Sequence, residues 1–211
     1  MSMELEQVLP GEIERRSFEI ITEELKGRRF DVGQEDIIKR VIHTTADFEY
    51  ADTMTFSPDA VKCALEALRD GGNTVIVTDT NMAWSGINKR ALERFGGKAC
   101  CFMADEDVAR EAKERGVTRA TVSMERAAKI EKPVIFAIGN APTALIQLYG
   151  MIEEGYRPAF IIGVPVGFVN VEAAKELILQ TKIPHIVNRG RKGGSNVAAA
   201  ICNAILYELG R

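Results

Sequence analysis

Residues 134–150 read VIFAIGNAPTALIQLYG, a sequence that predicts a strand, a sharp turn and a helix in succession. The run 134–138 is short, apolar and rich in β-branched and aromatic residues, which is typical of a strand buried on both faces. Pro142 suits a helix start because its fixed φ is already helical. Apolar residues then recur through 143–154 at helical spacing. The stretch therefore predicts one βα unit of a parallel sheet.

The same unit recurs through the rest of the chain. Further strands are predicted at 74–78, 99–103, 160–164 and 185–188, and helices at 82–95, 105–115, 124–130, 171–180 and 195–209. Strands that alternate with helices pair in parallel through right-handed crossovers, so helices cover both faces of the sheet. We therefore predict an α/β fold of three layers, α/β/α, around a five-stranded parallel sheet.

The first part of the chain adds to this sheet. Residues 12–25 and 37–47 are predicted as extra N-terminal helices, and 48–56 as an irregular polar connection. Ser57 and Pro58 are typical of the start of a further helix, and the glycines at 71–72 of its end. The 211 residues, 46% of them hydrophobic, suffice for one sizeable core, so we expect a single domain over 1–211.

Composition argues against several classes of function. The net charge of −3 and the 7% of aromatic residues argue against a nucleic-acid-binding protein. No apolar run approaches the length of a membrane span, and residues 1–11 lack the basic and apolar regions of a signal peptide. The four cysteines have no metal-ligand spacing, so we expect no metal site and a reducing cytoplasm as the location.

The segment 37–47 contains the clearest candidate for acid–base chemistry. At helical spacing Arg40, His43 and Asp47 share one narrow face with Asp36, opposite an apolar face. Imidazole titrates near neutral pH, and a nearby carboxylate can fix its tautomer, as in a general acid. The alternative is a solvated helix face with an incidental histidine, and spacing alone leaves both open.

Three loops follow the predicted strands at the edge where parallel sheets bind ligands. Asn140 lies in the first loop, and the second, 163–168, is an apolar run with two glycines and a proline. In the third, 188–195, glycines and the following helix start favour an anion, and Arg191 and Gly194 are candidate binding residues. The alternative for this basic loop is a solvated turn.

Other chemistry finds little support. The nucleotide patterns GxxxxGK[ST] and GxGxxG are absent, which weakens ATP and nicotinamide interpretations. His185 and the cysteines are interpreted as structural residues. The candidates for a second catalytic carboxylate are Asp47, Asp52 and Asp79. None of them stands in a distinctive sequence pattern. The residues alone thus indicate a polyanionic, partly apolar ligand at the strand ends.

Four sequence blocks resemble, in order, the signatures of the precorrin-8X methylmutase family. They are RVIH at 40–43, GNAPTAL at 139–145, GVPVGFV at 163–169 and RGRKGGS at 189–195. The resemblance extends from about residue 14 to the C-terminus. The run HTTADF at 43–48 is more similar to the cobalt-precorrin-8 branch than to the metal-free branch.

The resemblance implies an isomerase of cobalamin biosynthesis with a flavodoxin-like sheet. Such an enzyme moves a methyl group from C-11 to C-12 of precorrin-8 or cobalt-precorrin-8, giving hydrogenobyrinate or cobyrinate. It also implies that His43 is the catalytic proton donor and acceptor and that Ser17 and Arg40 contact substrate. Asn140, Arg191 and Gly194 are assigned to binding from their chemistry within the matching blocks.

The implied reaction is an intramolecular 1,5-sigmatropic shift, so no cofactor is expected. The implied partners are the tetrapyrrole substrate, a second copy of the chain in a homodimer, and the next pathway enzyme, to which product would be handed over. Two alternatives remain. A non-catalytic tetrapyrrole carrier would use the same pocket without needing His43, and a nucleotide-type methyltransferase would depend on an added methyl donor.

Overall fold

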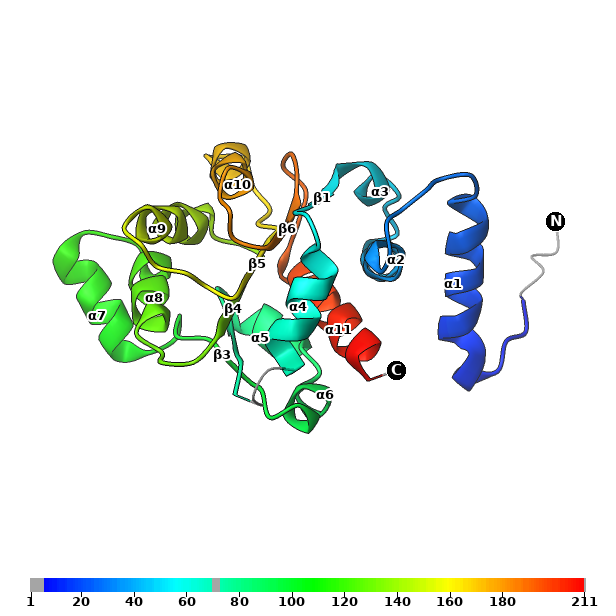
Figure 1. Cartoon of the computed structure of the whole chain (residues 1–211), viewed down its shortest axis with the longest axis horizontal. Helices are drawn as coiled ribbons and strands as arrows, with labels where there is room; N and C mark the ends of the chain where they lie inside the picture. The colour runs from blue at the N-terminus through cyan, green and yellow to red at the C-terminus, as the bar shows by residue number, and fades with distance from the viewer. Residues whose placement is uncertain (1–5, 70–72, 211) are drawn as a thin grey trace.

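A six-stranded sheet in the order β1-β6-β5-β4-β2-β3 forms the centre of the fold (Figure 1). The structure, a computed structural model, describes residues 6–69 and 73–210. Five strands run parallel: β2 (Val75–Thr78), β3 (Lys98–Cys100), β4 (Val134–Ile138), β5 (Phe160–Gly163) and β6 (His185–Asn188). Numbered along the chain, these five follow the order 2-1-3-4-5, which is the flavodoxin-like arrangement and confirms the predicted fold class.

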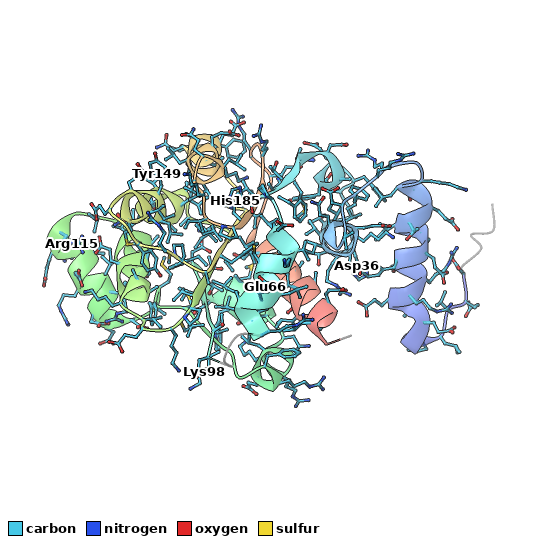
Figure 2. All side chains as sticks on the ribbon, in the orientation of Figure 1. Asp36, Glu66, Lys98, Arg115, Tyr149 and His185 are labelled. Atoms are coloured by element: carbon cyan, nitrogen blue, oxygen red, sulfur yellow. The ribbon has the colours of Figure 1, made fainter. Side chains whose placement is uncertain are left out.

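Helices cover both faces of the sheet. On one side lie α8 (Arg119–Ala128), α9 (Pro142–Glu153) and α10 (Val171–Leu179), with α7 (Glu106–Arg115) outside α8. On the other side lie α4 (Ala60–Arg69), α5 (Asn81–Gly86), α6 (Lys89–Arg94) and α11 (Ser195–Leu209). Side chains fill the space between these layers (Figure 2).

Strand β4 shows why its sequence is apolar throughout. Ile135 and Ala137 lie in the apolar cluster on the α11 side, whereas Phe136 and Ile138 lie in the cluster on the α9 side. Successive strand residues point to opposite faces, and both faces are covered here. All five residues of the strand are therefore buried.

The N-terminal helices form a further layer beyond α11. A short turn, η1 (Pro10–Glu12), leads into α1 (Ile13–Glu24), and α2 (Gln34–Thr45) packs between α1 and α11 (Figure 1). Helix α3 (Tyr50–Thr53) follows α2 and leads directly to the sheet edge. This layer confirms the two predicted extra helices.

The prediction of five strands was incomplete, because residues 48–56 are not wholly irregular. They contain α3 and the strand β1 (Met54–Phe56), which pairs antiparallel with the edge strand β6. A strand of three residues is too short to show an alternating pattern, so only its pairing partner identifies it.

The predicted helix start at Ser57 and Pro58 was wrong. Ser57 instead pairs with the head of β6: its N–H donates to the carbonyl of His185, and its Oγ accepts from the N–H of His185. Asp59 then adopts a left-handed backbone with φ of 53°, and α4 begins at Ala60. The glycines predicted to end this helix at 71–72 lie outside the described residues.

Two further helices differ from their predicted bounds. The helix predicted at 82–95 is divided into α5 and α6, because Asn88 accepts a hydrogen bond from the N–H of Ala91 and caps a new helix. The helix predicted at 124–130 begins earlier, at Arg119, after Thr118 caps it. In both places a polar cap, and not apolar spacing, sets the boundary.

Candidate active site

Helix α2 presents His43 on its polar face. Ile38, Val41 and Ile42 are buried, whereas His43 is exposed one residue further on, as the amphipathic pattern predicts. The ring of Phe18 from α1 lies 5.3 Å from the imidazole, measured between ring centroids. The imidazole therefore combines an apolar neighbour with access to a ligand.

Arg40 lies one turn before His43 on the same helix. Its guanidinium lies 5.0 Å from the centroid of the Phe18 ring and 4.8 Å from that of Tyr207 on α11. Nη1 of Arg40 also donates to Oε1 of Glu14 at 2.9 Å. These residues line a hollow of about 400 Å³ between α1, α2 and α11. The two rings and Glu14 hold a cation at the surface of this hollow.

Ser17 lies on α1, next to Phe18 in the sequence. Its hydroxyl donates to the carbonyl of Ile13 at 2.9 Å, one turn earlier on the same helix. The oxygen can still accept a hydrogen bond. The fold therefore brings Ser17, Arg40 and His43 to one pair of facing helices, although they are distant in sequence.

The loops after β4 and β6 form the second part of the site. A Cβ atom added to Gly139 would lie 2.7 Å from both the carbonyl oxygen of Gly194 and the Cα of Ser195. One added to Gly193 would strike the carbonyl of Val164 after β5. Three strand ends thus meet with almost no space between their backbones, and Asn140 is exposed beside them.

A buried carboxylate organises the loop after β4. Asp79, at the end of β2, accepts hydrogen bonds from the N–H groups of Gly139 at 2.8 Å, Asn140 at 2.8 Å and Ala141 at 2.6 Å. Burial raises the pKa of the Asp79 carboxyl, and the three N–H donors oppose that rise. Asp79 therefore holds the Asn140 loop and is not exposed to a ligand.

The basic side chains after β6 all have acidic partners. Nε of Arg191 lies 3.2 Å from Oε2 of Glu172, and its guanidinium lies 5.6 Å from the centroid of the Phe168 ring. Arg189 approaches Glu176 at 3.7 Å. The predicted cluster of cations is therefore partly neutralised by α10 in this state.

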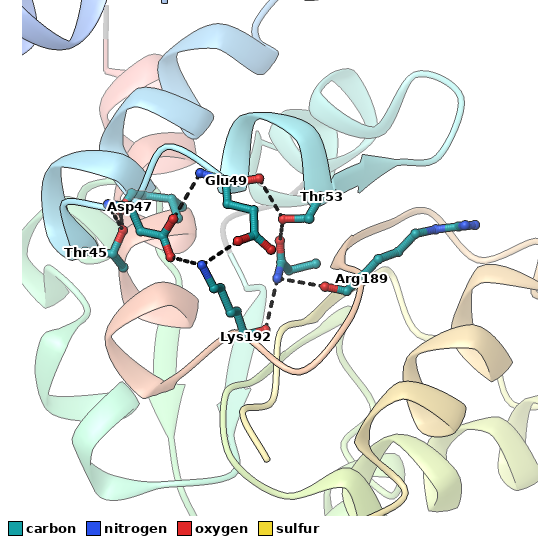
Figure 3. A network of polar contacts seen from close by, with 8 residues as sticks. Thr45, Asp47, Glu49, Thr53, Arg189 and Lys192 are labelled. Atoms are coloured by element: carbon teal, nitrogen blue, oxygen red, sulfur yellow. Dashed lines mark hydrogen bonds and ion pairs between the residues drawn. The ribbon is translucent and has the colours of Figure 1, made fainter. Parts of the chain in front are cut away.

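Lys192 joins the two parts of the site (Figure 3). Its Nζ donates to Oδ2 of Asp47 at 2.5 Å and to Oε2 of Glu49 at 2.7 Å, in the segment that follows α2. The hydrogen bond from Lys192 lowers the pKa of Asp47, and the one to Asp47 raises the pKa of Lys192. The end of the His43 helix is thus tied to the loop that contains Arg191 and Gly194.

The role suggested for Asp47 needs correction. Sequence spacing placed this carboxylate on the His43 face, where it could orient the imidazole. Ala46 instead adopts a left-handed backbone that ends α2, and Asp47 accepts from Lys192 and from the N–H of Glu49. Asp47 therefore positions the basic loop.

The other candidate catalytic residues from the sequence lie in surroundings that indicate a structural role. His185 is buried at the head of β6, and its Nδ1 lies 2.7 Å from the carbonyl oxygen of Ile183. Asp52 forms an ion pair with Arg28 at the surface. Burial raises the pKa of the thiol to about 11 in Cys100 and about 12 in Cys202, so both stay protonated at neutral pH.

The described residues contain no group of three or more His, Cys, Asp or Glu side chains placed to hold a metal ion. Within the same part of the chain, no helix has the length and apolar character required to cross a membrane.

Two residues with clear structural roles were missed or undervalued in the sequence. Asp79 was noted but not singled out, because nothing local reveals that three N–H groups from a distant loop converge on it. Lys175 was not noted at all. Its signal is a charged residue inside the apolar pattern of α10, beside Val171, Ala174 and Ile178, which are all buried.

Comparison with known proteins gives consistent matches along the chain. Residues 12–208 match the family model described as precorrin-8X methylmutase. The chain is 46% identical over 199 residues to a cobalt-precorrin-8 methylmutase of Priestia megaterium, covering 94% of this chain and 88% of the relative. It is also 46% identical over 206 residues to a cobalt-precorrin-8 methylmutase of Salmonella typhimurium, covering 95% and 96%.

The fold is similar to a solved structure as well. That structure, a precorrin-8X methyl mutase from Thermus thermophilus, superposes with a TM-score of 0.86 at 35% identity. The superposition covers 94% of this chain and 98% of that one. The sequence match includes all the predicted site residues, from Ser17 to Gly194.

Proposed function

The chain belongs to the precorrin-8X methylmutase family, whose members are isomerases of cobalamin biosynthesis, and from this premise we propose its reaction and its site residues. The reaction is the migration of a methyl group from C-11 to C-12 of cobalt-precorrin-8, giving cobyrinate. The observation that supports it best is the bridge from Lys192 to Asp47 and Glu49, because this bridge ties the helix of His43 to the loops at the strand ends.

His43 is the proton donor and acceptor in this proposal. As imidazolium it donates a proton to the conjugated ring, whose π electrons reorganise so that the methyl group leaves C-11 and bonds to C-12 of the same molecule. The proton then returns to the neutral imidazole. Atoms and electrons balance without an oxidant, a reductant or a methyl donor. General acid catalysis of this kind typically accelerates a reaction by about 10²–10⁴-fold.

The rim of the site is suited to a ring fringed with carboxylates. Arg40 and Arg191 are cations whose present partners, Glu14 and Glu172, are more than half exposed. Exposed ion pairs contribute only about 0–1 kcal/mol, so a substrate carboxylate can replace either glutamate at little cost. Ser17, Asn140 and the backbone at Gly194 supply hydrogen bonds in this proposal, and the ring itself would lie on apolar surface.

A second copy of the chain completes the site in our proposal. The hollow beside Arg40 measures about 400 Å³, near the lower end of the roughly 300–1,000 Å³ common for ligand pockets. At the strand ends Phe168 is 81% exposed and Val169 is 79% exposed. A partner subunit would cover these apolar side chains and enclose the macrocycle, which supports the homodimer that the family implies.

Conversion of excess substrate tests this function against that of a carrier. Purified protein is mixed with a large molar excess of cobalt-precorrin-8, or of metal-free precorrin-8, while the visible spectrum is recorded. An isomerase converts the whole excess, and faster conversion of the cobalt form would support the cobalt branch. A spectral change that stops at one equivalent of substrate per chain would contradict catalysis and favour a carrier. Dependence of the rate on an added methyl donor would contradict an intramolecular shift.

A further inference from the structure

Lys175 is a fully buried amine on α10, 0% exposed. Its Nζ donates to the carbonyl of Gly190 at 2.7 Å and to the carbonyl of Lys192 at 2.8 Å. Lysine is rarely buried this completely, and a buried charge is costly unless it is paired. Both carbonyls belong to one loop, so the buried amine holds the basic loop after β6.

All four carbonyls of residues 189–192 accept hydrogen bonds from within the protein. Nδ2 of Asn188 donates to the carbonyl of Arg189 at 3.1 Å and to that of Lys192 at 3.0 Å (Figure 3). The N–H of Gly167 donates to the carbonyl of Arg191 at 3.2 Å. With the two contacts of Lys175, the acceptors of the loop are therefore satisfied by the protein itself.

The N–H groups of the same loop, unlike its carbonyls, are only partly hydrogen-bonded within the described part of the chain. Those of Arg189 and Gly194, at its two ends, donate to the carbonyls of Thr53 and Val164. Between them, the N–H groups of residues 190–193 have no acceptor within the described part of the chain, and these residues are partly or fully exposed. Consecutive free N–H groups in a glycine-containing turn are suited to an anion.

We propose that Lys175 is a positioning residue, which holds the carbonyls of Gly190 and Lys192 inward and so leaves the N–H groups of 190–193 available to a carboxylate of the substrate. The inference rests on the proposed function, because it assumes a polycarboxylate ligand at these loops. Lys175 itself is covered and does not touch the ligand.

The charge of Lys175 also favours a carboxylate at this loop. Burial lowers the pKa of the amine to about 8, so most of it is still an ammonium at neutral pH. A positive charge directly beneath the loop adds to the attraction for a carboxylate above it. An apolar side chain of similar volume would fill the same space but supply neither the donors nor the charge.

The test compares Lys175→Met with Lys89→Met. Lys89 is a matched control, because its Nζ also donates to a backbone carbonyl, that of Trp84 at 2.6 Å, but at the start of α6. Both variants are checked for folding by circular dichroism. KM and kcat are then measured with cobalt-precorrin-8, and the Kd for hydrogenobyrinate, the metal-free product, by titration.

We expect Lys175→Met to raise KM and Kd about tenfold or more, as for loss of a charge-assisted hydrogen bond, while kcat changes less than threefold. Lys89→Met should leave all three values within about twofold of the wild type. A folded Lys175→Met protein with unchanged KM and Kd would overturn the inference, as would a loss confined to kcat.

A measurement on the wild-type protein covers the case in which Lys175→Met does not fold. The amide resonances of Gly190 and Gly193 should shift on addition of hydrogenobyrinate, and unchanged resonances in the bound protein would overturn the inference. A wild-type protein that binds this product but converts no substrate would overturn only the proposed isomerase function. The two failures are therefore distinguishable.

Discussion

Arg40 shows how one side chain can be prepared for a ligand before the ligand arrives. Its guanidinium is packed between the rings of Phe18 and Tyr207, so little side-chain entropy remains to be lost on binding. Its partner Glu14 is largely exposed and easily exchanged. In our proposal Arg40 therefore serves binding, and proton transfer is left to His43.

Replacing Arg40 by glutamine should weaken substrate binding much more than it slows the chemical step. Loss of one hydrogen bond to a charged group costs about 1.5–3 kcal/mol, so we expect KM to rise about 10- to 100-fold with kcat almost unchanged. Steady-state kinetics measure both values. Arg115→Gln, on α7 at the opposite end of the molecule from α1 (Figure 2), is the control and should behave as wild type. A fall in kcat without a change in KM would contradict this role.

His185 should make the stability of the protein depend on pH. Burial lowers the pKa of its imidazole in the folded state below the ordinary value of 6.5, although the carbonyl of Ile183 opposes this. The unfolded chain therefore binds more protons as the pH falls below 6.5, and protonation favours unfolding. The contribution of neutral His185 to the unfolding free energy is fully present above pH 6.5 and is lost as the pH falls toward the folded-state pKa.

Urea denaturation between pH 5 and pH 7.5, about the range in which histidine titrates, measures this dependence. We expect the decrease in unfolding free energy at low pH to be smaller in His185→Gln than in wild type. His43→Gln should retain the decrease, because His185 is still present. An equal decrease in His185→Gln and wild type would rule out His185 as the source.

Single residues were predictable where their surroundings are local. The exposed position of His43 follows from the apolar spacing around it on α2. The partners of Asp79 and Lys175 were not predictable, because both side chains bond to backbone groups of loops that lie far away in the sequence. Helix spacing alone also assigned Asp47 to His43, whereas the end of α2 at Ala46 turns it toward Lys192.

Among the structural elements, the loop after β4 is held by a single side chain. Pro142 starts α9, and the three N–H groups before it converge on Asp79 instead of on a cap of the helix itself. The loop conformation is thus fixed from a neighbouring strand. This explains how Asn140 can be exposed and still held in place.

Asp79→Asn should destabilise the protein, because an amide group can accept from fewer of the three N–H groups and places its own donors against them. We expect the unfolding free energy to fall by about 2–4 kcal/mol, measured by urea denaturation at neutral pH. Asp107→Asn is the control: this carboxylate bonds to Arg126 at the surface, where ion pairs contribute little to stability. An equally small decrease in unfolding free energy in both variants would show that the Asp79 contacts do not stabilise the fold.

Whole elements were predictable in kind and order, but less so at their ends. Short apolar strands alternating with amphipathic helices revealed the parallel sheet, since both patterns are visible within the elements themselves. The strand β1 and the start of α4 depend on pairing with the distant strand β6, and the break between α5 and α6 depends on a polar cap at Asn88. Such boundaries therefore became visible only in the structure.

For the molecule as a whole, the sheet and the N-terminal layer have separate functions in our proposal. The sheet supplies two loops that bind carboxylates, after β4 and β6, and the apolar loop after β5. Helix α2 supplies the acid and Arg40, and α1 supplies Ser17. Lys192 joins them in one subunit, and a second subunit would enclose the ligand. The family resemblance provides the reaction, which fold and composition alone did not specify.

The proposed homodimer predicts a particle of twice the chain mass of 23.2 kDa. Sedimentation velocity over a range of micromolar concentrations measures the mass without immobilising the protein. A dimer throughout this range, or a monomer–dimer equilibrium with activity that increases with dimer content, agrees with the proposal. A fully active monomer at every concentration would contradict it.

Proton transfer by His43 is best tested with His43→Ala under conditions that separate binding from turnover. The protein is mixed with a slight excess of cobalt-precorrin-8, and the visible spectrum and the retained coloured corrinoid are followed. We expect the variant to bind the corrinoid with near wild-type affinity and to convert none of it. Conversion by His43→Ala at a rate close to that of the wild type would show that another group supplies the proton.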